Sequence, residues 1–138
     1  MAEQHLLTPA VIVVEDDPVL SVVLQRALRQ LTRRYEIVHV TDGFAALTQF
    51  DQRRVPLLIT DYMLRSSMDG LKLTSTVRMR SPETRIVLIT AYTAPDVEQA
   101  AAERGVEFYL PKPFLLQDLE EIVQTVLAVW QTQEQEQV

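Results

Sequence analysis

The 138-residue sequence contains no cysteine, so it can form neither a disulfide nor a thiolate metal site. It has no run of about 18 uninterrupted apolar residues, the length that a membrane-spanning helix needs. The first residues lack a basic region followed by an apolar one, so no signal peptide is indicated. Basic side chains number 13 against 19 acidic ones, and a net charge of −6 argues against binding nucleic acid through its phosphates. We therefore expect a soluble, cytoplasmic protein that contacts neither membrane nor nucleic acid directly.

The composition that remains is typical of a globular domain. Hydrophobic residues make up 47% of the chain and charged residues 23%. A chain of this length buries roughly 68–70% of its unfolded surface, which is enough for one domain without covalent cross-links. We expect that domain over residues 10–130, after an N-terminal extension of residues 1–9 and before a polar, disordered tail of residues 131–138.

Apolar runs alternate with segments of helical periodicity along the chain. Five short runs have the pattern of buried strands, the first of them entirely β-branched: residues 11–14, 37–40, 56–60, 85–90 and 107–110. After each comes a segment with apolar side chains at helical spacing: residues 18–31, 43–50, 71–77, 95–104 and 114–130. This alternation predicts an α/β fold, with five helices on both faces of a five-stranded parallel sheet.

Chemically useful side chains stand where four of these strands end. They are Glu15, Asp16 and Asp17 after the first strand, Asp61 at the third, Thr90 at the fourth and Lys112 after the fifth. In parallel α/β folds, ligands bind beyond the carboxyl ends of the strands, so we expect these side chains to meet. Oxygen ligands without histidine or cysteine suit Mg²⁺, and aspartate carboxylates can form covalent phosphates. A lysine and a hydroxyl supply donors to phosphoryl oxygens.

Each of these residues, taken alone, also has an ordinary structural explanation. Asp16 or Asp17 could simply cap a helix, Asp61 could be a turn residue, and Lys112 could be a solvated surface charge. The prediction of a phosphoryl-transfer site depends on all four strand ends carrying the residue type that the chemistry needs.

Five motifs carry a resemblance to a known family. They are Val13-Val14-Glu15-Asp16-Asp17-Pro18, Asp61-Tyr62-Met63-Leu64, Met68-Asp69-Gly70-Leu71, Ile89-Thr90-Ala91-Tyr92 and Leu110-Pro111-Lys112-Pro113-Phe114. In this order, over about residues 10–130, they resemble the receiver domains of two-component response regulators. The resemblance implies a doubly wound, flavodoxin-like sheet, and the strand order 2-1-3-4-5 is carried over from the family.

The resemblance also implies a function in a phosphorelay. Asp61 would be the phosphoacceptor, taking a phosphoryl group from a histidine kinase or a histidine phosphotransfer protein. Mg²⁺, with Mn²⁺ as an alternative, would be bound by Asp16, Asp61 and the Met63 main-chain carbonyl, with Glu15 acting through water. Such a protein is a signalling phosphoacceptor rather than an enzyme, since it catalyses only its own phosphotransfer and slow self-dephosphorylation.

Further roles follow from the same resemblance. Thr90, Ala91 and Lys112 would bind the phosphoryl group, and Thr90 with Tyr109 would form the switch. The Lys112–Pro113 peptide bond would be cis, which only X-Pro bonds adopt cheaply. The switch would reshape the face formed by the fourth helix, fifth strand and fifth helix, which would bind an unknown output protein or a second copy in a homodimer.

Three features leave alternatives open. The loop after Asp61 has Arg65 where family members commonly have proline and is one residue longer, which keeps open a degenerate receiver that binds a partner without phosphorylation. The last helix carries a wide apolar surface including Trp130, which is either a broad core face or a dimer or partner surface. Residues 131–138 are too few for an output domain, so if this sequence is the whole protein we expect output through protein contact or onward phosphotransfer.

Two other functions are disfavoured by particular residues. A flavin-binding electron carrier would need a phosphate-binding loop after the first strand. The three carboxylates at that place in this sequence would repel the phosphate. A phosphatase with an aspartyl nucleophile would need a second acid at the place of Met63.

Overall fold

A five-stranded parallel sheet forms the centre of the protein. The structure, a computed structural model, describes residues 8–64, 68–92 and 94–136. The strands are β1 (Ala10–Val14), β2 (Glu36–Val40), β3 (Leu57–Asp61), β4 (Arg85–Thr90) and β5 (Phe108–Pro111). Their spatial order is β2-β1-β3-β4-β5, and every neighbouring pair is parallel. The predicted fold class is confirmed, and the strand order agrees with the one that the resemblance implies.

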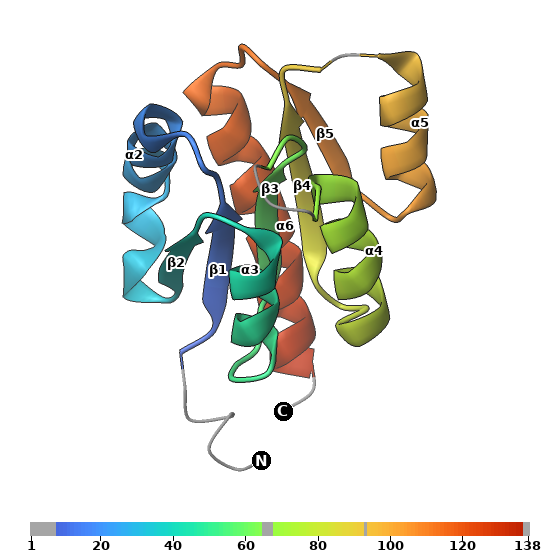
Figure 1. Cartoon of the computed structure of the whole chain (residues 1–138). Coiled ribbons are helices and arrows are strands. Elements are labelled where there is room, and N and C mark those ends of the chain that lie inside the picture. The colour runs from blue at the N-terminus through green and yellow to red at the C-terminus, as the bar shows by residue number, and fades with distance from the viewer. Residues whose placement is uncertain (1–7, 65–67, 93, 137–138) are drawn as a thin grey trace.

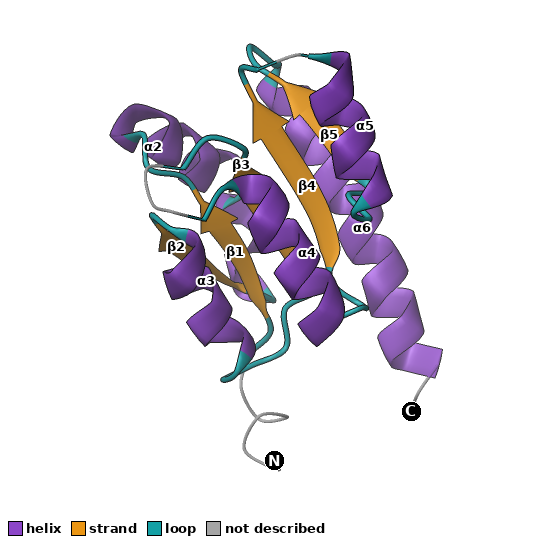
Figure 2. Cartoon of the chain, turned by 45° about the vertical axis from the view of Figure 1, so that its right-hand side comes forward, coloured by secondary structure: helices purple, strands orange, loops and turns teal. Residues whose placement is uncertain are grey.

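Helices cover both faces of this sheet (Figures 1 and 2). They are α2 (Pro18–Ala27), α3 (Gly43–Phe50), α4 (Gly70–Arg80), α5 (Pro95–Glu103) and α6 (Leu116–Glu136), with a short 3-10 helix, η1 (Arg29–Arg33), after α2. The side chains of β1 alternate between two cores, because successive residues of a strand point to opposite faces. Val11 and Val13 pack with α2 and α6, whereas Ile12 and Val14 pack with α3 and α4.

Aspartates begin three of the helices at the carboxyl edge of the sheet. Asp17 Oδ1 accepts a hydrogen bond from the Val19 amide at 2.9 Å, as the predicted cap of α2. Asp42 and Asp69 cap α3 and α4 in the same way. These caps satisfy amides that have no partner within the helix, so each helix starts directly beside the strand end that precedes it.

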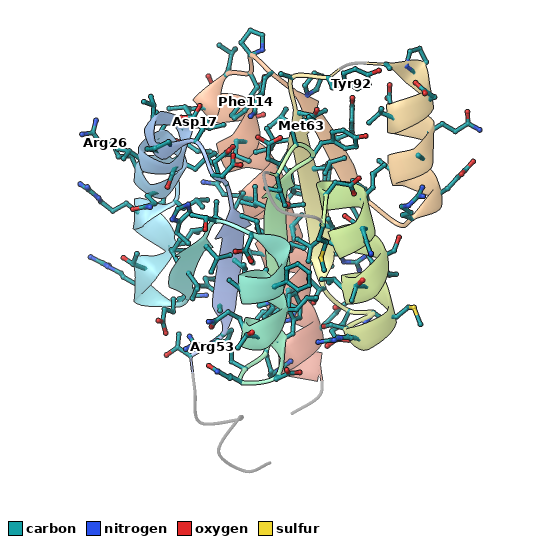
Figure 3. The ribbon with its side chains drawn as sticks, in the orientation of Figure 1. Asp17, Arg26, Arg53, Met63, Tyr92 and Phe114 are labelled. Atoms are coloured by element: carbon teal, nitrogen blue, oxygen red, sulfur yellow. The ribbon has the colours of Figure 1, made fainter. Side chains whose placement is uncertain are left out.

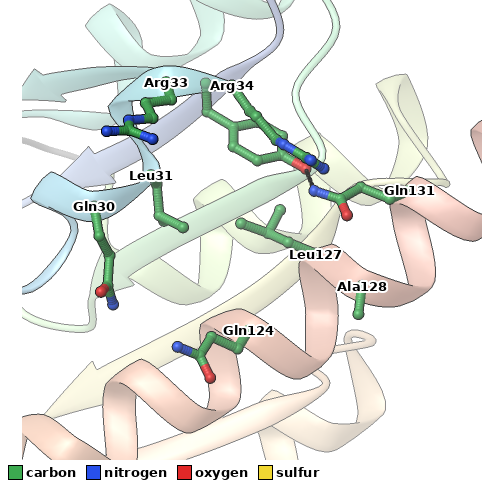
Figure 4. A pocket seen from close by; sticks show the side chains of 9 residues that line it. Gln30, Leu31, Arg33, Arg34, Gln124, Leu127, Ala128 and Gln131 are labelled. Carbon is green, nitrogen blue, oxygen red and sulfur yellow. Dashed lines mark hydrogen bonds between the residues drawn. The ribbon is translucent and has the colours of Figure 1, made fainter.

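The last helix extends beyond the end that the sequence predicts, into the stretch expected to be a disordered tail. Helix α6 continues to Glu136, so residues 131–136 are helical, while residues 137–138 lie outside the described part of the chain. The few apolar residues in this stretch suggested disorder, but glutamine and glutamate are good helix formers. Gln131 also ties the extension down, since its Nε2 donates to the Tyr35 hydroxyl at 2.9 Å across a groove of about 300 Å³ (Figure 4).

Trp130 packs within its own chain. Its ring meets that of Tyr35 edge-on at 6.0 Å between centroids, and the Arg54 guanidinium carbon lies 4.9 Å from the Trp130 centroid. Part of the wide apolar surface of α6 is therefore core, whereas Leu116 and Val129 are exposed. No helix in the described ranges is long and apolar enough to cross a membrane.

Candidate functional site

Two buried carboxylates and one ammonium meet at the carboxyl edge of the sheet. Asp61 is the last residue of β3, Glu15 follows β1 and Lys112 follows β5. Lys112 Nζ lies 2.5 Å from Asp61 Oδ2 and 3.5 Å from Glu15 Oε1. Asp61 is 6% exposed and Glu15 1% exposed. The parallel topology thus unites residues far apart in sequence, as the strand-end pattern predicts.

Glu15 has the most perturbed acid–base behaviour of this cluster. Burial raises the pKa of its carboxyl to about 7, although the Asp17 amide, which donates to Glu15 Oε2 at 3.1 Å, acts in the opposite direction. That pKa already includes a smaller upward effect of the neighbouring Asp61 and a downward effect of the Lys112 charge. Glu15 therefore changes its protonation state near neutral pH.

Lys112 serves as the counter-ion of both carboxylates. Burial alone lowers the pKa of Lys112, but the hydrogen bond from Lys112 to Asp61 and the charges of Asp61 and Glu15 outweigh burial and raise it. The ammonium group is therefore charged throughout the physiological range and faces the position where further negative charge would develop.

The second oxygen of Asp61 is fixed by the chain that follows it. The Met63 amide donates to Asp61 Oδ1 at 3.1 Å, and the Gly70 amide donates to the Tyr62 carbonyl at 2.9 Å. A Cβ at position 70 would lie 2.3 Å from the Asp61 carbonyl oxygen. Gly70 is thus a site-shaping residue to which the sequence analysis assigned no role, although the Asp69-Gly70 pair within its motif was the available signal.

Thr90 and Tyr109 converge on a third residue, Tyr92. The buried Thr90 Oγ1 accepts from the Tyr92 amide at 2.8 Å and donates to the Tyr92 carbonyl at 3.4 Å. The Tyr109 hydroxyl donates to the same carbonyl at 3.1 Å. Burial raises the pKa of Tyr109, and Glu98 adds to the effect, so its hydroxyl remains a donor. The hydrogen bonds of both switch hydroxyls thus go to Tyr92 rather than to Asp61.

The ring of Tyr92 stacks on that of Tyr62. Their centroids are 6.1 Å apart and their planes differ by 13°. Met63 lies at the same end of the molecule as Tyr92 (Figure 3), and both are largely exposed. The sequence analysis did not find this pair, since stacking between residues 30 positions apart leaves no local signal.

The other predicted site residues differ in how deeply they are buried at this edge of the sheet. Asp16 is half-buried beside Glu15, Ala91 is exposed after β4, and the Lys112–Pro113 peptide bond is cis as predicted. The Lys112 amide donates to the Thr90 carbonyl at 2.7 Å, which brings the ends of β4 and β5 together. The altered loop at residues 65–67 lies outside the described residues.

The oxygen atoms at this site are of the type that binds a hard divalent cation, but the side chains are not grouped closely around one point. Within the described residues, no group of three or more carboxylates and imidazoles is arranged to hold a metal. The available donors are carboxylate and carbonyl oxygens, which are the ligands that Mg²⁺ prefers and completes with water. The residues present therefore fit Mg²⁺ with water completing its coordination.

Response regulators are among the known proteins that this sequence resembles. Residues 11–124 match the family described as the response regulator receiver domain. The transcriptional regulatory protein PrrA of Mycobacterium tuberculosis is 28% identical over 120 residues, covering 87% of this chain and 50% of PrrA. The DNA-binding transcriptional regulator NtrC of Escherichia coli is 29% identical over 123 residues, covering 89% of this chain and 26% of NtrC. The chain thus spans half or less of the length of these relatives.

Solved structures show the same relationship. The chemotaxis response regulator CheY4 of Vibrio cholerae is 26% identical, with a TM-score of 0.74 over 87% of this chain and 99% of that one. The signal receiver domain of an HD domain-containing protein from Pseudomonas fluorescens is also 26% identical, with a TM-score of 0.82 over 91% of this chain and 99% of that one. With the family match over most of its length, the chain belongs to the response regulator receiver domains of two-component signalling.

Proposed function

We propose that Asp61 accepts a phosphoryl group from a histidine kinase or a histidine phosphotransfer protein. The observation that carries this proposal is the placement of the Asp61 carboxylate, which is buried and held between Lys112 Nζ and the Met63 amide. A nucleophile held in one orientation loses little freedom on reaching the transition state. The ammonium beside it is already in place to stabilise phosphoryl oxygens.

In the transfer step, an Asp61 carboxylate oxygen forms a bond to phosphorus while the bond between phosphorus and the donor's imidazole nitrogen breaks. Lys112 donates hydrogen bonds to the phosphoryl oxygens. These oxygens carry the negative charge while the phosphoryl group passes from the leaving group to the nucleophile. Asp16, Asp61, the Met63 carbonyl and, through water, Glu15 would hold Mg²⁺. The ion, when bound, supplies charge stabilisation for the transferring oxygens.

The phosphoryl group then changes what Thr90 binds. Phosphorylation adds about −1.5 to −2 charges at Asp61, which attracts the Thr90 hydroxyl away from Tyr92. Tyr109 turns inward when Thr90 moves, and the face of α5, β5 and α6 changes shape. That face corresponds to the fourth helix, fifth strand and fifth helix of the sequence analysis, and we propose that it binds the output protein or a second copy.

The test is the intact mass of the protein after incubation with Mg²⁺ and acetyl phosphate. We expect one phosphate adduct in the wild type and none in Asp61→Asn. Asp69→Asn is the matched control, because it makes the same change at a nearby helix cap where asparagine caps as well as aspartate. An adduct that persists in Asp61→Asn would contradict the assignment, and the absence of any adduct in the wild type would favour the degenerate receiver.

A further inference from the structure

The two switch side chains are held by a single carbonyl group. The Tyr92 carbonyl accepts from the Thr90 hydroxyl and from the Tyr109 hydroxyl, at 3.4 Å and 3.1 Å. The Thr90 oxygen is held a second time, because it accepts from the Tyr92 amide at 2.8 Å. Movement of residue 92 therefore alters the partners of both hydroxyl groups together.

The position of Tyr92 is in turn fixed from the phosphoacceptor side. Its ring stacks on Tyr62, which directly follows Asp61 in the chain. The backbone of Tyr62 is anchored twice, by its amide bonding to the Ile89 carbonyl at 2.9 Å and by its carbonyl accepting from Gly70 at 2.9 Å. The stacked ring thus has a rigid base, while the segment that carries Tyr92 projects beyond the end of β4.

The stack contributes little to the core. Tyr92 is 54% exposed and Tyr62 is half-buried, and neither belongs to the two core clusters of the described residues. Offset stacking between two aromatic rings is nevertheless favourable beyond the area that it buries. Its main structural effect is to hold the segment after β4 against the segment after β3.

We propose that Tyr62 and Tyr92 are positioning residues that hold the Thr90 hydroxyl away from Asp61 before phosphorylation. This inference rests on the proposed function, since it assumes that Thr90 moves to the phosphoryl group. The stack stabilises the resting arrangement, and any event that engages Thr90 at Asp61 must work against it. Loss of the stack therefore shifts the equilibrium toward the switched arrangement by about 2- to 10-fold, the range that a stacked pair supports.

The test uses fluorine NMR on the full chain labelled with fluorotyrosine. The sequence has four tyrosines, so the spectrum holds four resonances that single Tyr→Phe variants assign. Beryllofluoride with Mg²⁺ mimics the phosphoryl group on a carboxylate and defines the switched position of the Tyr109 resonance. Tyr62→Leu removes one ring of the stack, and Tyr62→Phe keeps a ring as the matched control.

We expect the Tyr109 resonance of Tyr62→Leu to move toward its switched position without beryllofluoride. Beryllofluoride should also bind Tyr62→Leu about 2- to 10-fold more tightly, since a ligand gains affinity when its favoured state is more populated. Tyr62→Phe should match the wild type in both measurements. Tyr92→Leu repeats the test from the other ring, because it leaves the Tyr92 carbonyl in place.

The outcomes separate this inference from the proposed function. The positioning role alone would be overturned if the wild type responds to beryllofluoride and both Tyr62→Leu and Tyr92→Leu behave like it. Behaving like it means that they show the same spectrum without beryllofluoride and respond at the same beryllofluoride concentration. A wild type whose tyrosine resonances ignore beryllofluoride would contradict the proposed function and overturn this inference with it.

Discussion

Glu15 is the most deeply buried acid of the site, and its protonation links stability to pH. Its folded-state pKa of about 7 lies above the ordinary value of 4.5. Between these two values the folded protein binds more protons at Glu15 than the unfolded chain does. The free energy of unfolding therefore falls as the pH rises through this window. Above about pH 7, where Glu15 is ionised in both states, the full destabilising effect of its buried charge is present.

We predict that Glu15→Gln stabilises the metal-free protein at pH 8 and has little effect at pH 5. The gain at pH 8 should be about 1–3 kcal/mol, because one unit of pKa corresponds to about 1.4 kcal/mol. Urea unfolding at the two pH values measures it. Glu121→Gln, at an exposed position on α6, is the control and should change stability little at either pH. Equal effects of Glu15→Gln at both pH values would contradict the prediction.

Two glycines in equivalent positions have different surroundings. Gly43 and Gly70 are the first residues of α3 and α4, each after an aspartate cap. A Cβ at Gly70 would lie 2.3 Å from the Asp61 carbonyl oxygen, whereas a Cβ at Gly43 would meet the Met68 Sδ at 2.6 Å. Backbone cannot yield without moving Asp61, but a methionine side chain adapts.

We predict that Gly70→Ala costs about 1–3 kcal/mol of stability, as overpacking does, and slows phosphorylation of Asp61. Gly43→Ala should cost less and leave the rate unchanged. Denaturant unfolding and the time course of the intact-mass adduct measure the two effects. The expectation fails if the two variants behave alike.

Met63 and Tyr92 bear on how long a phosphoryl group would persist. Both are large, exposed side chains at this end of the molecule, and neither is an obvious group for positioning an attacking water. We predict that the purified phosphoprotein loses its adduct slowly, and that Met63→Asn, whose amide can hold a water, loses it faster. A half-life of seconds for the wild type, followed by intact mass, would contradict slow self-dephosphorylation.

At the scale of the elements, β1 was the most predictable strand because it is a continuous apolar run, whereas β2 is interrupted by His39 and is marked only by the residues around it. Aspartates at 17 and 42 and glycine at 105 mark helix boundaries by their own chemistry, and Gly105 has the positive φ of 85° expected after a helix. The break after Ala27 was not predictable, because apolar spacing continues through Leu31. Contacts made across long sequence distances, such as the stacked Tyr62 and Tyr92, are not encoded in local periodicity.

Helix α6 offers a test of how its last turns are held. Trp130 packs on Tyr35 and Arg54, whereas its neighbour Val129 is 46% exposed. We predict that Trp130→Ala costs about 2 kcal/mol, from lost apolar contact and the cation–π interaction. Val129→Ala should cost well under half as much. Thermal unfolding compares the two, and equal losses would show that Trp130 does not anchor the helix.

At the scale of the whole molecule, the site depends on three strands that are distant in sequence. Lys112 and Glu15 are 97 positions apart, and Lys112 and Asp61 are 51 apart. No single supersecondary unit contains all three residues.

We therefore predict that phosphorylation competence is lost in urea at the same midpoint as global unfolding. Trp130, the single tryptophan of the chain, reports unfolding by its fluorescence. A small domain of this size commonly unfolds in one cooperative step, so the two curves should coincide. Loss of phosphorylation at clearly lower urea would show that the β5 end detaches before the rest.

The path of Lys112 across the sheet has a consequence for signalling fidelity. The lysine reaches Asp61 only when β5, the last strand in the chain, has added to β4 at the edge of the sheet. A chain that is incompletely folded or truncated before this strand lacks the ammonium group beside its acceptor. Phosphorylated molecules would therefore be those that have finished folding, and incompletely folded molecules would not carry the signal.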